Sequence, residues 1–303
     1  MVICWIGVIT LLCQDYADAG VVLMMSKPIL SFVHANGFPG QSYRSVWAPL
    51  AEYFELQIVD RLGHHPDYPI ESNWSRSVDE YLAQLPTDRG PIVALGHSFG
   101  GVIVYMAALK APERFAAVVM LDPPWMRGPD RWSLKLGKRL GLIDRMTPAG
   151  KTRGRRAHWS SRDQASETLR RKGLFRRFTD TSFNDYMTAG LEASPQGGVK
   201  LRFDPEVEVN IFRNLPDHLG RRANPSVPAG LIYGQQSDLL NPKRLARLKS
   251  LNIAFDSVPG GHMFPFEHPT LACQCVLDMF RRLCPSMVAA SAPDTETALV
   301  SQG

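Results

Sequence analysis

The feature that most constrains this chain is a serine between two glycines, at the point where an apolar strand would turn into a helix. The run reads Pro91-Ile92-Val93-Ala94-Leu95-Gly96-His97-Ser98-Phe99-Gly100-Gly101. Apolar residues fill 92–95, and apolar residues at helical spacing follow over 102–109. Glycine on both sides lets strand and helix pack with no Cβ atom between them. The pattern predicts a sharp turn that holds the Ser98 hydroxyl out at the end of a sheet.

A serine in this position requires further groups before it can act as a nucleophile. At a helix N-terminus, unpaired backbone N–H groups and the positive end of the helix dipole favour a developing negative charge. A base must take the serine proton, and an acid must orient that base. In folds built around such a turn, the chain order is serine, then aspartate or glutamate, then histidine. The partners of Ser98 are therefore expected later in the chain.

Two residues near the end of the chain fit these roles. His262 directly follows the last predicted strand in Pro259-Gly260-Gly261-His262, and we expect it to be the base. His268, at a predicted helix start, is the alternative. Asp238 comes just after a predicted strand over 230–233, and we expect it to be the acid. Asp122 also ends a strand and is the alternative, although the two prolines after it would equally explain a plain turn.

Stabilising an oxyanion takes two N–H donors that already point at the developing charge. The backbone N–H of Phe99, directly after the serine, is expected to be one of them. The second is expected from the loop His34-Ala35-Asn36-Gly37-Phe38-Pro39-Gly40, which follows the first predicted strand. Gly37 allows a tight backbone path there, so we predict that Phe38 supplies the donor.

The order of apolar segments predicts an α/β fold with an insertion. Over residues 25–123 and 228–285, strands and helices alternate, which requires a mostly parallel sheet, of six to eight strands, covered by helices on both faces. Between them, 124–227 carries amphipathic helical stretches and no buried strand, so we predict an inserted helical cap. With 303 residues, 45% hydrophobic and 21% charged, the chain has the composition of a globular protein.

The two ends of the chain are expected to lie outside this core. We treat residues 1–24 as a doubtful extension with the true start at Met24 or Met25, and 286–303 as a flexible tail. The apolar stretch over 1–12 is too short to span a bilayer and has no basic flank, so we expect no stable membrane insertion; export through this segment is the weak alternative. Five cysteines, an odd number without metal or redox spacing, indicate a reducing, cytoplasmic compartment.

The predicted insertion is strongly basic. Residues 124–180 contain 16 Lys or Arg against 5 Asp or Glu, a surplus of +11 in a chain whose net charge is +5. Solvated basic helices would explain this composition. Attraction to an anionic substrate, a lipid surface or an acidic partner is the functional alternative. No recognised nucleic-acid motif accompanies the charge, so we expect no nucleic-acid partner.

Taken together, these motifs resemble the α/β-hydrolase superfamily, and most closely its bacterial branch with a helical cap after the sixth strand. The resemblance rests on the 34–40 loop, Gly96-His97-Ser98-Phe99-Gly100-Gly101, Tyr233-Gly234 with Asp238, and Gly261-His262, and it covers about residues 27–285. It implies a Ser-His-Asp triad, no metal, no organic cofactor, and a substrate pocket between cap and sheet. An aspartate at position 98 would have indicated an epoxide hydrolase or a haloalkane dehalogenase.

The chain departs from the family pattern at two places. The usual first two antiparallel strands are missing or would have to come from the doubtful N-terminal extension. The usual His-Gly pair of the oxyanion loop reads His-Ala-Asn-Gly, which leaves open whether His34 or Asn36 takes the place of the family histidine.

The resulting expectation is a serine hydrolase, monomeric or homodimeric, for carboxylic esters of small or medium acyl chains. Its partner would be a small-molecule ester, which the basic cap would allow to be anionic. Trp125, Met126, Trp132 and Phe183 are the candidate pocket residues of the cap, although packing within the cap explains each equally well. The alternatives are a carbon–carbon bond hydrolase or a cofactor-free perhydrolase with the same triad, and a non-catalytic ligand-binding protein, which the filled triad positions argue against.

Overall fold

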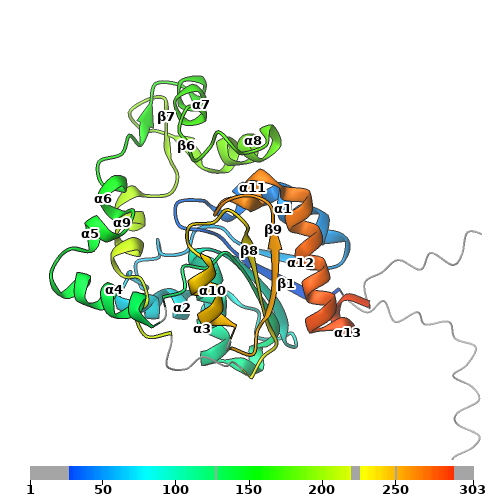
Figure 1. Cartoon of the computed structure of the whole chain (residues 1–303). Helices are drawn as coiled ribbons and strands as arrows, with labels where there is room; N and C mark the ends of the chain where they lie inside the picture. Colours follow the sequence, from blue (N-terminus) through cyan, green and yellow to red (C-terminus); the bar gives the residue numbers. More distant parts are fainter. Residues whose placement is uncertain (1–26, 127, 220–225, 250, 290–303) are drawn as a thin grey trace, which may run out of the picture.

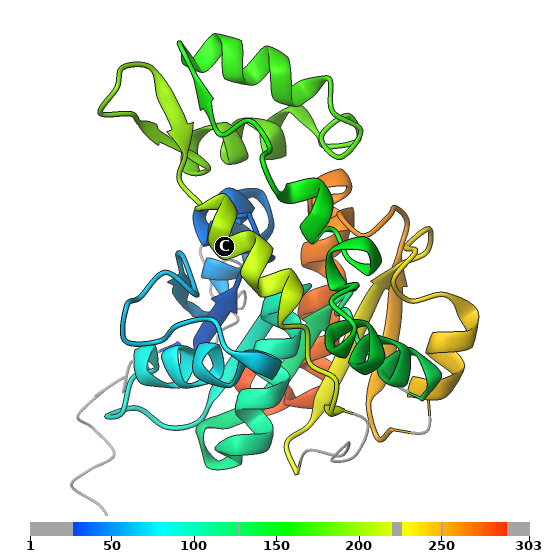
Figure 2. The same cartoon turned by 90° about the vertical axis from the view of Figure 1, so that its left-hand side faces the viewer.

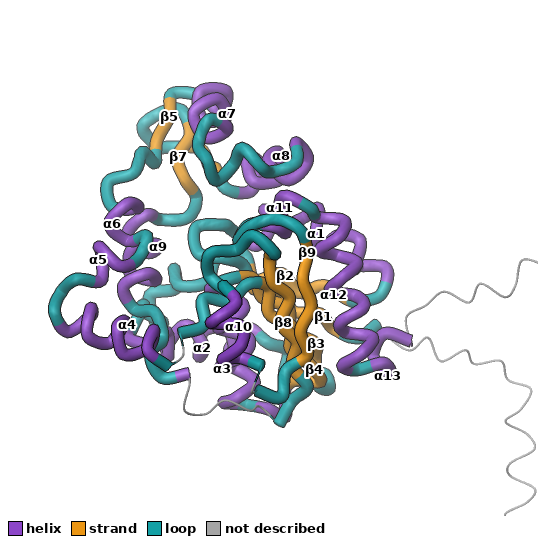
Figure 3. The backbone as a smooth tube through the Cα atoms, viewed as in Figure 1, coloured by secondary structure: helices purple, strands orange, loops and turns teal. Residues whose placement is uncertain are grey.

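A six-stranded parallel sheet forms the centre of the computed structural model, which describes residues 27–126, 128–219, 226–249 and 251–289 (Figures 1 and 3). The strand order is β2-β1-β3-β4-β8-β9, and every neighbouring pair is parallel. The predicted α/β-hydrolase fold is therefore confirmed, with six strands. The N-terminal extension lies outside the described residues. The strands are β1 (Ile29–Val33), β2 (Glu55–Val59), β3 (Ile92–His97), β4 (Phe115–Leu121), β8 (Ala229–Gly234) and β9 (Ala254–Val258).

The central strands β1, β3, β4 and β8 are buried on both faces because helices cover each side of the sheet, whereas the edge strands β2 and β9 are mostly half-buried. In β1, Leu30 and Phe32 belong to one apolar cluster, while Ile29 and Val33 belong to another. This separation follows from the two-residue period of a strand. An apolar sequence such as that of β3 therefore indicates a central strand with both faces covered.

Two sets of helices make up the outer layers (Figure 1). On one face, α1 (Arg44–Trp47) packs against α12 (Pro269–Leu283), and α12 lies against β4, β8 and β9. On the other face, α2 (Ser75–Gln84) packs against α3 (Phe99–Lys110), which lies on β3 and β4. The remaining core helices are α10 (Pro242–Leu248), α11 (Phe264–Glu267), α13 (Pro285–Ala289) and the short 3₁₀ helices η3 (Ser72–Trp74) and η4 (Pro112–Arg114). The helix α13 occupies the start of the segment predicted as a flexible tail; 290–303 lie outside the described residues.

The helix expected over about 42–53 is instead three short helices. These are η1 (Gly40–Tyr43), α1 and η2 (Ala48–Glu52). A proline stands within the first two positions of η2. Proline lacks the N–H that would continue an α-helix, which accounts for the break after α1.

The insertion carries helices, as the sequence indicates, and also a small antiparallel sheet (Figure 2). The sheet has the order β5-β7-β6, from β5 (His158–Trp159), β6 (Leu191–Ala193) and β7 (Val199–Leu201). Strands of two or three residues are too short to show an alternating pattern, so the sequence did not reveal them. The cap helices are α4 (Pro129–Arg139), α5 (Ile143–Met146), α6 (Ala149–Thr152), α7 (Arg162–Arg170), α8 (Asp180–Ala189) and α9 (Pro205–Arg213).

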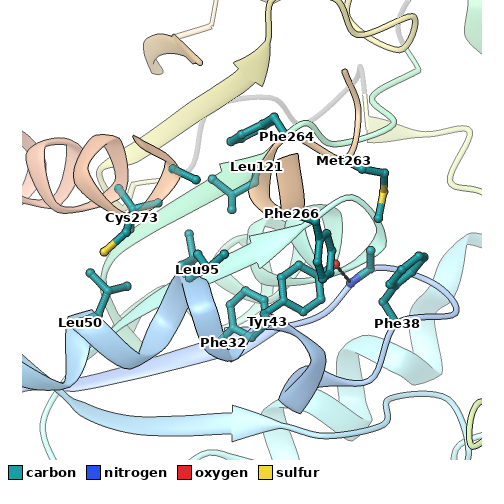
Figure 4. Close-up of a cluster of buried hydrophobic side chains, with 14 of the residues drawn as sticks. Phe32, Phe38, Tyr43, Leu50, Leu95, Leu121, Met263, Phe264, Phe266 and Cys273 are labelled. Carbon is teal, nitrogen blue, oxygen red and sulfur yellow. Dashed lines mark hydrogen bonds between the residues drawn. The ribbon is translucent and has the colours of Figure 1, made fainter. Parts of the chain in front are cut away.

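Aromatic packing attaches the cap to the core. Phe178 of the cap stacks on Phe266, with ring centroids 4.5 Å apart, and Tyr186 lies 5.0 Å from Phe38. Figure 4 shows Phe38, Tyr43 and Phe266 side by side at the edge of the core cluster. Because buried aromatic pairs add both apolar burial and a preferred geometry, this contact holds one end of the cap over the sheet.

Two further properties of the described residues bear on the expected compartment and the membrane. Cys273, Cys275 and Cys284 are free thiols. Within the described ranges, no helix is long and apolar enough to cross a bilayer.

The serine turn between β3 and α3 depends on glycine where the backbone segments touch. A Cβ added to Gly96 would lie 2.2 Å from the carbonyl oxygen of Gly100, and one added to Gly100 would lie 2.2 Å from that of Val33. Distances this short are not possible for non-bonded atoms, and the obstructing groups are backbone. The turn therefore requires glycine at both positions.

We expect Gly100→Ala to lower the free energy of unfolding by at least about 3 kcal/mol, because β1 and α3 must separate to admit a methyl group. Gly90→Ala is the matched control, since a Cβ there meets no atom within 4 Å. Urea denaturation followed by circular dichroism measures both. Equal stability of the two variants would contradict the close packing described here.

Candidate active site

Ser98 lies at the tip of the turn between β3 and α3, in a backbone conformation that few residues adopt. Its φ is 53° and its ψ is −113°. The Ser98 N–H donates to the carbonyl of Leu121 at 2.8 Å, which ties the turn to the end of β4. Strained backbone of this kind persists only where the surrounding structure holds it, and it occurs preferentially at functional sites. The hydroxyl group is half-buried and borders a cavity that is described below.

His262 and Asp122 form the central polar contact of the site. The imidazole Nδ1 of His262 lies 2.7 Å from Oδ2 of Asp122, and the carboxylate is fully buried. A carboxylate accepts hydrogen bonds, so Nδ1 carries the proton and Nε2 is the unprotonated nitrogen when the ring is neutral. His262 borders the same cavity as Ser98.

The Asp122 carboxylate is held by donors from a second loop. The Ser237 hydroxyl donates to Oδ2 at 2.5 Å, and the Gly234 N–H donates to Oδ1 at 3.3 Å. The Asp122 N–H donates to the carbonyl of Ile232 at 2.8 Å. Hydrogen bonds to the ionised form offset the cost of burying this charge. The backbone of Asp122 itself has a positive φ of 43°.

The expectation that Asp238 contacts the imidazole is corrected by this geometry. Asp238 is exposed, whereas the residue before it, Ser237, points inward and supports Asp122. The carboxylate opposite His262 comes from the end of β4, the strand beside the serine strand in the sheet. Asp122, named as the alternative from its place at a strand end, occupies this position.

The loop that carries His262 reaches Asp122 by crossing closely over the end of β8. A Cβ on Gly234 would lie 2.2 Å from the carbonyl oxygen of Gly261, and Gln236 donates its N–H to Gly260 at 2.8 Å. Gly260 has a φ of +110°, which favours glycine. The carboxylate of Glu267 accepts from the Gly261 N–H at 3.1 Å. His268, the alternative base, is at the N-terminal boundary of α12 and does not border the cavity.

A buried chain of hydrogen bonds connects three loops of the site. The Ala35 N–H donates to the Tyr43 hydroxyl at 3.1 Å, the interaction drawn as a dashed line in Figure 4. That hydroxyl lies 2.7 Å from Nδ1 of His97, and Nε2 of His97 lies 2.9 Å from the carbonyl oxygen of His262. A carbonyl only accepts, so His97 Nε2 carries the proton and His97 Nδ1 accepts from Tyr43. No pattern in the sequence indicates a role for these two side chains.

Burial keeps His97 and His34 neutral. Desolvation, with a smaller contribution from His262, holds the pKa of His97 well below its ordinary value. Desolvation lowers the pKa of His34 to about 4. The Leu62 N–H donates to Nε2 of His34 at 2.8 Å, and His34 Nδ1 lies 2.8 Å from the carbonyl of Ala35. His34 therefore anchors the 34–40 loop to the chain after β2.

The two expected oxyanion donors have different surroundings. Phe99 is the first residue of α3, and its N–H has no acceptor among the described residues. The Phe38 N–H, in contrast, donates to the carbonyl of Ala35 at 3.1 Å in a tight turn, so it is already used. Within the same turn, the Asn36 N–H has no acceptor in the described part of the chain, and Asn36 borders the cavity. Asn36 is thus better placed than Phe38 to supply the second donor.

A cavity of about 520 Å³ lies between the core and the cap. This size is typical of a site for a small molecule. The core contributes residues on the loops after β1, β3 and β9, and the cap contributes apolar and cationic side chains from several of its helices. The lining includes Ala35, Asn36, Phe38, Ser98, Phe99, Met126, Met146, Lys151, Arg155, Lys172, Glu208, Ile211, Phe212, Arg244, His262 and Met263.

Of the four cap residues proposed from the sequence, only Met126 borders this cavity. Trp125 is 2% exposed and packs on Tyr105, so it belongs to the core. Trp132 is 56% exposed and lies beside Arg131 on the outer surface. Phe183 is buried against Phe175 within the cap. Apolar composition does not distinguish these positions, because it indicates that a side chain is buried but not whether it faces the cavity.

Residues 32–273 match a family described as the alpha/beta hydrolase family. The chain belongs to the alpha/beta hydrolase family. This membership agrees with the predicted fold and with the turn around Ser98. No group of three or more His, Cys, Asp or Glu residues able to hold a metal ion is present in the described ranges.

Among curated relatives, the chain is 34% identical over 92 residues to a pimeloyl-[acyl-carrier protein] methyl ester esterase of Photobacterium profundum, covering 30% of this chain and 35% of that protein. It is 37% identical over 84 residues to lipase LipV of Mycobacterium tuberculosis, covering 26% and 32%. The matches thus span about a third of the length of these relatives. The crystal structure of E-2-(acetamidomethylene)succinate hydrolase is similar at 19% identity and a TM-score of 0.65, covering 84% and 92%.

We expect Tyr43→Phe to lower the free energy of unfolding by about 1–3 kcal/mol, because the buried Ala35 N–H loses its acceptor and His97 loses its donor. Tyr186→Phe is the matched control: Tyr186 is equally buried, and its hydroxyl forms no hydrogen bond with the described residues. Chemical denaturation measures the difference. A Tyr43 variant as stable as the Tyr186 variant would show that the chain of hydrogen bonds contributes nothing.

Proposed function

We propose that this protein is a serine hydrolase that cleaves carboxylic esters of small or medium acyl chains through an acyl-enzyme intermediate. The observation that carries the proposal is the His262–Asp122 hydrogen bond at 2.7 Å, in a cavity that the strained Ser98 also borders. Family membership and relatives named as an esterase and a lipase support the same class of reaction.

In the proposed first step, the Ser98 Oγ attacks the ester carbonyl carbon while Nε2 of His262 takes its proton. The negative Asp122 carboxylate stabilises the imidazolium that forms and keeps the ring in the required orientation. The N–H groups of Phe99 and Asn36 bind the oxyanion of the tetrahedral intermediate. The Phe99 donor is at the first turn of the twelve-residue helix α3, where the helix dipole adds to the stabilisation.

The intermediate then collapses, and the bond to the leaving oxygen breaks. His262 gives its proton to the alcohol, which departs and leaves the acyl group on Ser98. In the second half of the reaction, His262 takes a proton from a water molecule, and the hydroxide attacks the acyl carbonyl. Collapse of this second intermediate returns the proton to Ser98 and releases the acid.

Tyr43, His97 and Ser237 act as positioning residues in this proposal. Ser237 holds the carboxylate of Asp122, and His97 holds the backbone of His262. None of the three has to exchange a proton with the substrate. These residues would increase the fraction of time in which the His262 imidazole is correctly oriented. A small misplacement of that imidazole would lower the rate of the reaction substantially.

Ser98 is the proposed nucleophile. A fluorophosphonate probe should label the folded protein, and Ser98→Ala should abolish labelling. The same variant should lose at least about 10⁴-fold in kcat on 4-nitrophenyl esters of two to eight carbons, because a triad without its nucleophile retains little catalysis. Labelling of the folded Ser98→Ala variant, or its unchanged turnover, would rule out this serine as the nucleophile.

Asp122 is the proposed acid of the triad. Asp122→Asn should lower kcat by about 10³–10⁴-fold, because the amide leaves the imidazole in the wrong tautomer. Asp238→Asn is the matched control and should stay within about threefold of the parent, as expected for an exposed residue. Circular dichroism confirms that both variants are folded. If the Asp238 variant were the more damaged, the acid would have to be reassigned to the loop after β8.

A further inference from the structure

The charged lining of the cavity is unbalanced toward positive charge. Four cationic side chains border it, and Glu208 is the one carboxylate among its described lining residues. One of the four, Arg244, is committed to Asp130, with its Nε 3.2 Å from the carboxylate. The other three are Lys151, Arg155 and Lys172, all from the cap.

Arg155 forms an ion pair and keeps one buried donor without an acceptor. Its Nη2 lies 2.5 Å from Oε2 of Glu208. Its Nε is buried and has no hydrogen-bond acceptor among the described residues. The side chain is 24% exposed and borders the cavity, and a guanidinium group can bind a carboxylate through hydrogen bonds and charge. Unpaired buried donors of this kind are costly unless a ligand satisfies them.

Glu208 balances part of the Arg155 charge and fixes the location of the pair. Its side chain is 8% exposed, and burial raises the pKa of the carboxyl group. The Asn36 side-chain amide donates to the Glu208 backbone carbonyl at 3.0 Å, and a Cβ on Gly37 would lie 3.0 Å from the Glu208 carboxyl carbon. The Arg155–Glu208 pair is therefore directly beside the loop that we assign to the oxyanion.

Lys172 adds a second cation that forms no ion pair at contact distance with the described residues, although Glu208 is close enough to contribute an upward shift to its pKa. No carboxylate of the described residues lies within ion-pair distance of its ammonium group, although Lys172 borders the cavity. Partial burial and the neighbouring charges of Arg155 and Arg156 lower the pKa of Lys172. A bound anion would relieve this repulsion between cations.

From these observations, and resting on the proposed esterase function, we propose that the cavity selects esters that carry a carboxylate. The guanidinium group of Arg155 binds that carboxylate and Lys172 adds its charge, while the ester carbonyl lies at Ser98. Because the Arg155–Glu208 pair borders the oxyanion loop, the carboxylate of the substrate is a few bonds from its own ester carbonyl.

The neighbouring Arg156 shows that the basic composition of the cap does not explain the site by itself. Its guanidinium donates to Gln164 at 2.7 Å, lies over the Trp159 ring and does not border the cavity. Adjacent arginines thus have separate positions, and of these two only Arg155 borders the cavity.

The test compares matched charged and neutral esters. Mono-4-nitrophenyl glutarate against 4-nitrophenyl valerate places the carboxylate on the acyl side, and 4-acetoxybenzoate against its methyl ester places it on the alcohol side. The parent should prefer the charged member of at least one pair in kcat/KM. Arg155→Gln should reduce that preference by about 10- to 100-fold, the range for one hydrogen-bonded charge pair. Lys172→Gln should reduce it by a smaller factor.

Arg171→Gln is the matched control. It removes one positive charge directly before Lys172 in the sequence, at an exterior position where Arg171 pairs with Glu167. It should leave the preference unchanged. No preference for the charged member of either pair, or an equal loss in the Arg155 and Arg171 variants, would overturn the proposal.

A binding measurement separates this proposal from the esterase function. Monomethyl glutarate should bind to the Ser98→Ala protein in calorimetry, and the double variant with Arg155→Gln should bind it at least about tenfold more weakly. If the parent hydrolyses no ester but this Arg155-dependent binding is found, the anion site stands and the proposed reaction fails. If neutral esters are cleaved and the anion does not bind, the esterase stands and the anion site is wrong.

Discussion

The buried carboxylate of Asp122 is the constraint on which the site depends. A charge removed from water is tolerated only where donors replace the lost solvation. Here the donors come from the loop after β8, through Ser237 and Gly234, and from the loop after β9, through His262. The ends of β4, β8 and β9 are consequently drawn together over the edge of the sheet. The same contacts that make the burial of the charge tolerable also orient the imidazole.

The chain of hydrogen bonds through Tyr43 and His97 extends this coupling to the other side of the serine. It links the backbone of Ala35 on one loop to the carbonyl of His262 on another, and it passes through the residue directly before Ser98. Both ends of this series of hydrogen bonds are backbone groups. The series therefore fixes the backbone path of the two loops and not only the positions of their side chains. Burial keeps His97 neutral, and the carbonyl oxygen of His262 fixes which of its nitrogens donates, so the arrangement has one consistent pattern of protons.

The sequence predicted the fold and the turn that carries Ser98 well, because those features depend on local patterns. Apolar strands, helical spacing and the two glycines are all readable along the chain. The acid was misplaced because it depends on which loop the His262 loop meets in space. An aspartate follows each of two strand ends. The close crossing of the His262 loop over Gly234 and the inward-pointing side chain of Ser237 place Asp122, and not Asp238, opposite the imidazole. The predicted pocket residues of the cap were misplaced for a similar reason. An apolar side chain can face a cavity or pack against another side chain, and the sequence is the same in both cases.

The proposed function divides its groups between the core and the cap. The groups assigned to bond cleavage are on the core, at the ends of parallel strands, where the sheet holds their positions. The groups assigned to recognition of charge, Arg155 and Lys172, are on the cap. The cap is also attached through contacts to the His262 loop region, where Arg177 pairs with Glu267 at 3.2 Å and the Thr179 N–H donates to Phe266 at 3.0 Å. A change in the position of the cap would therefore alter the wall of the cavity and the support of the imidazole together, so substrate charge and turnover need not be independent properties of this protein.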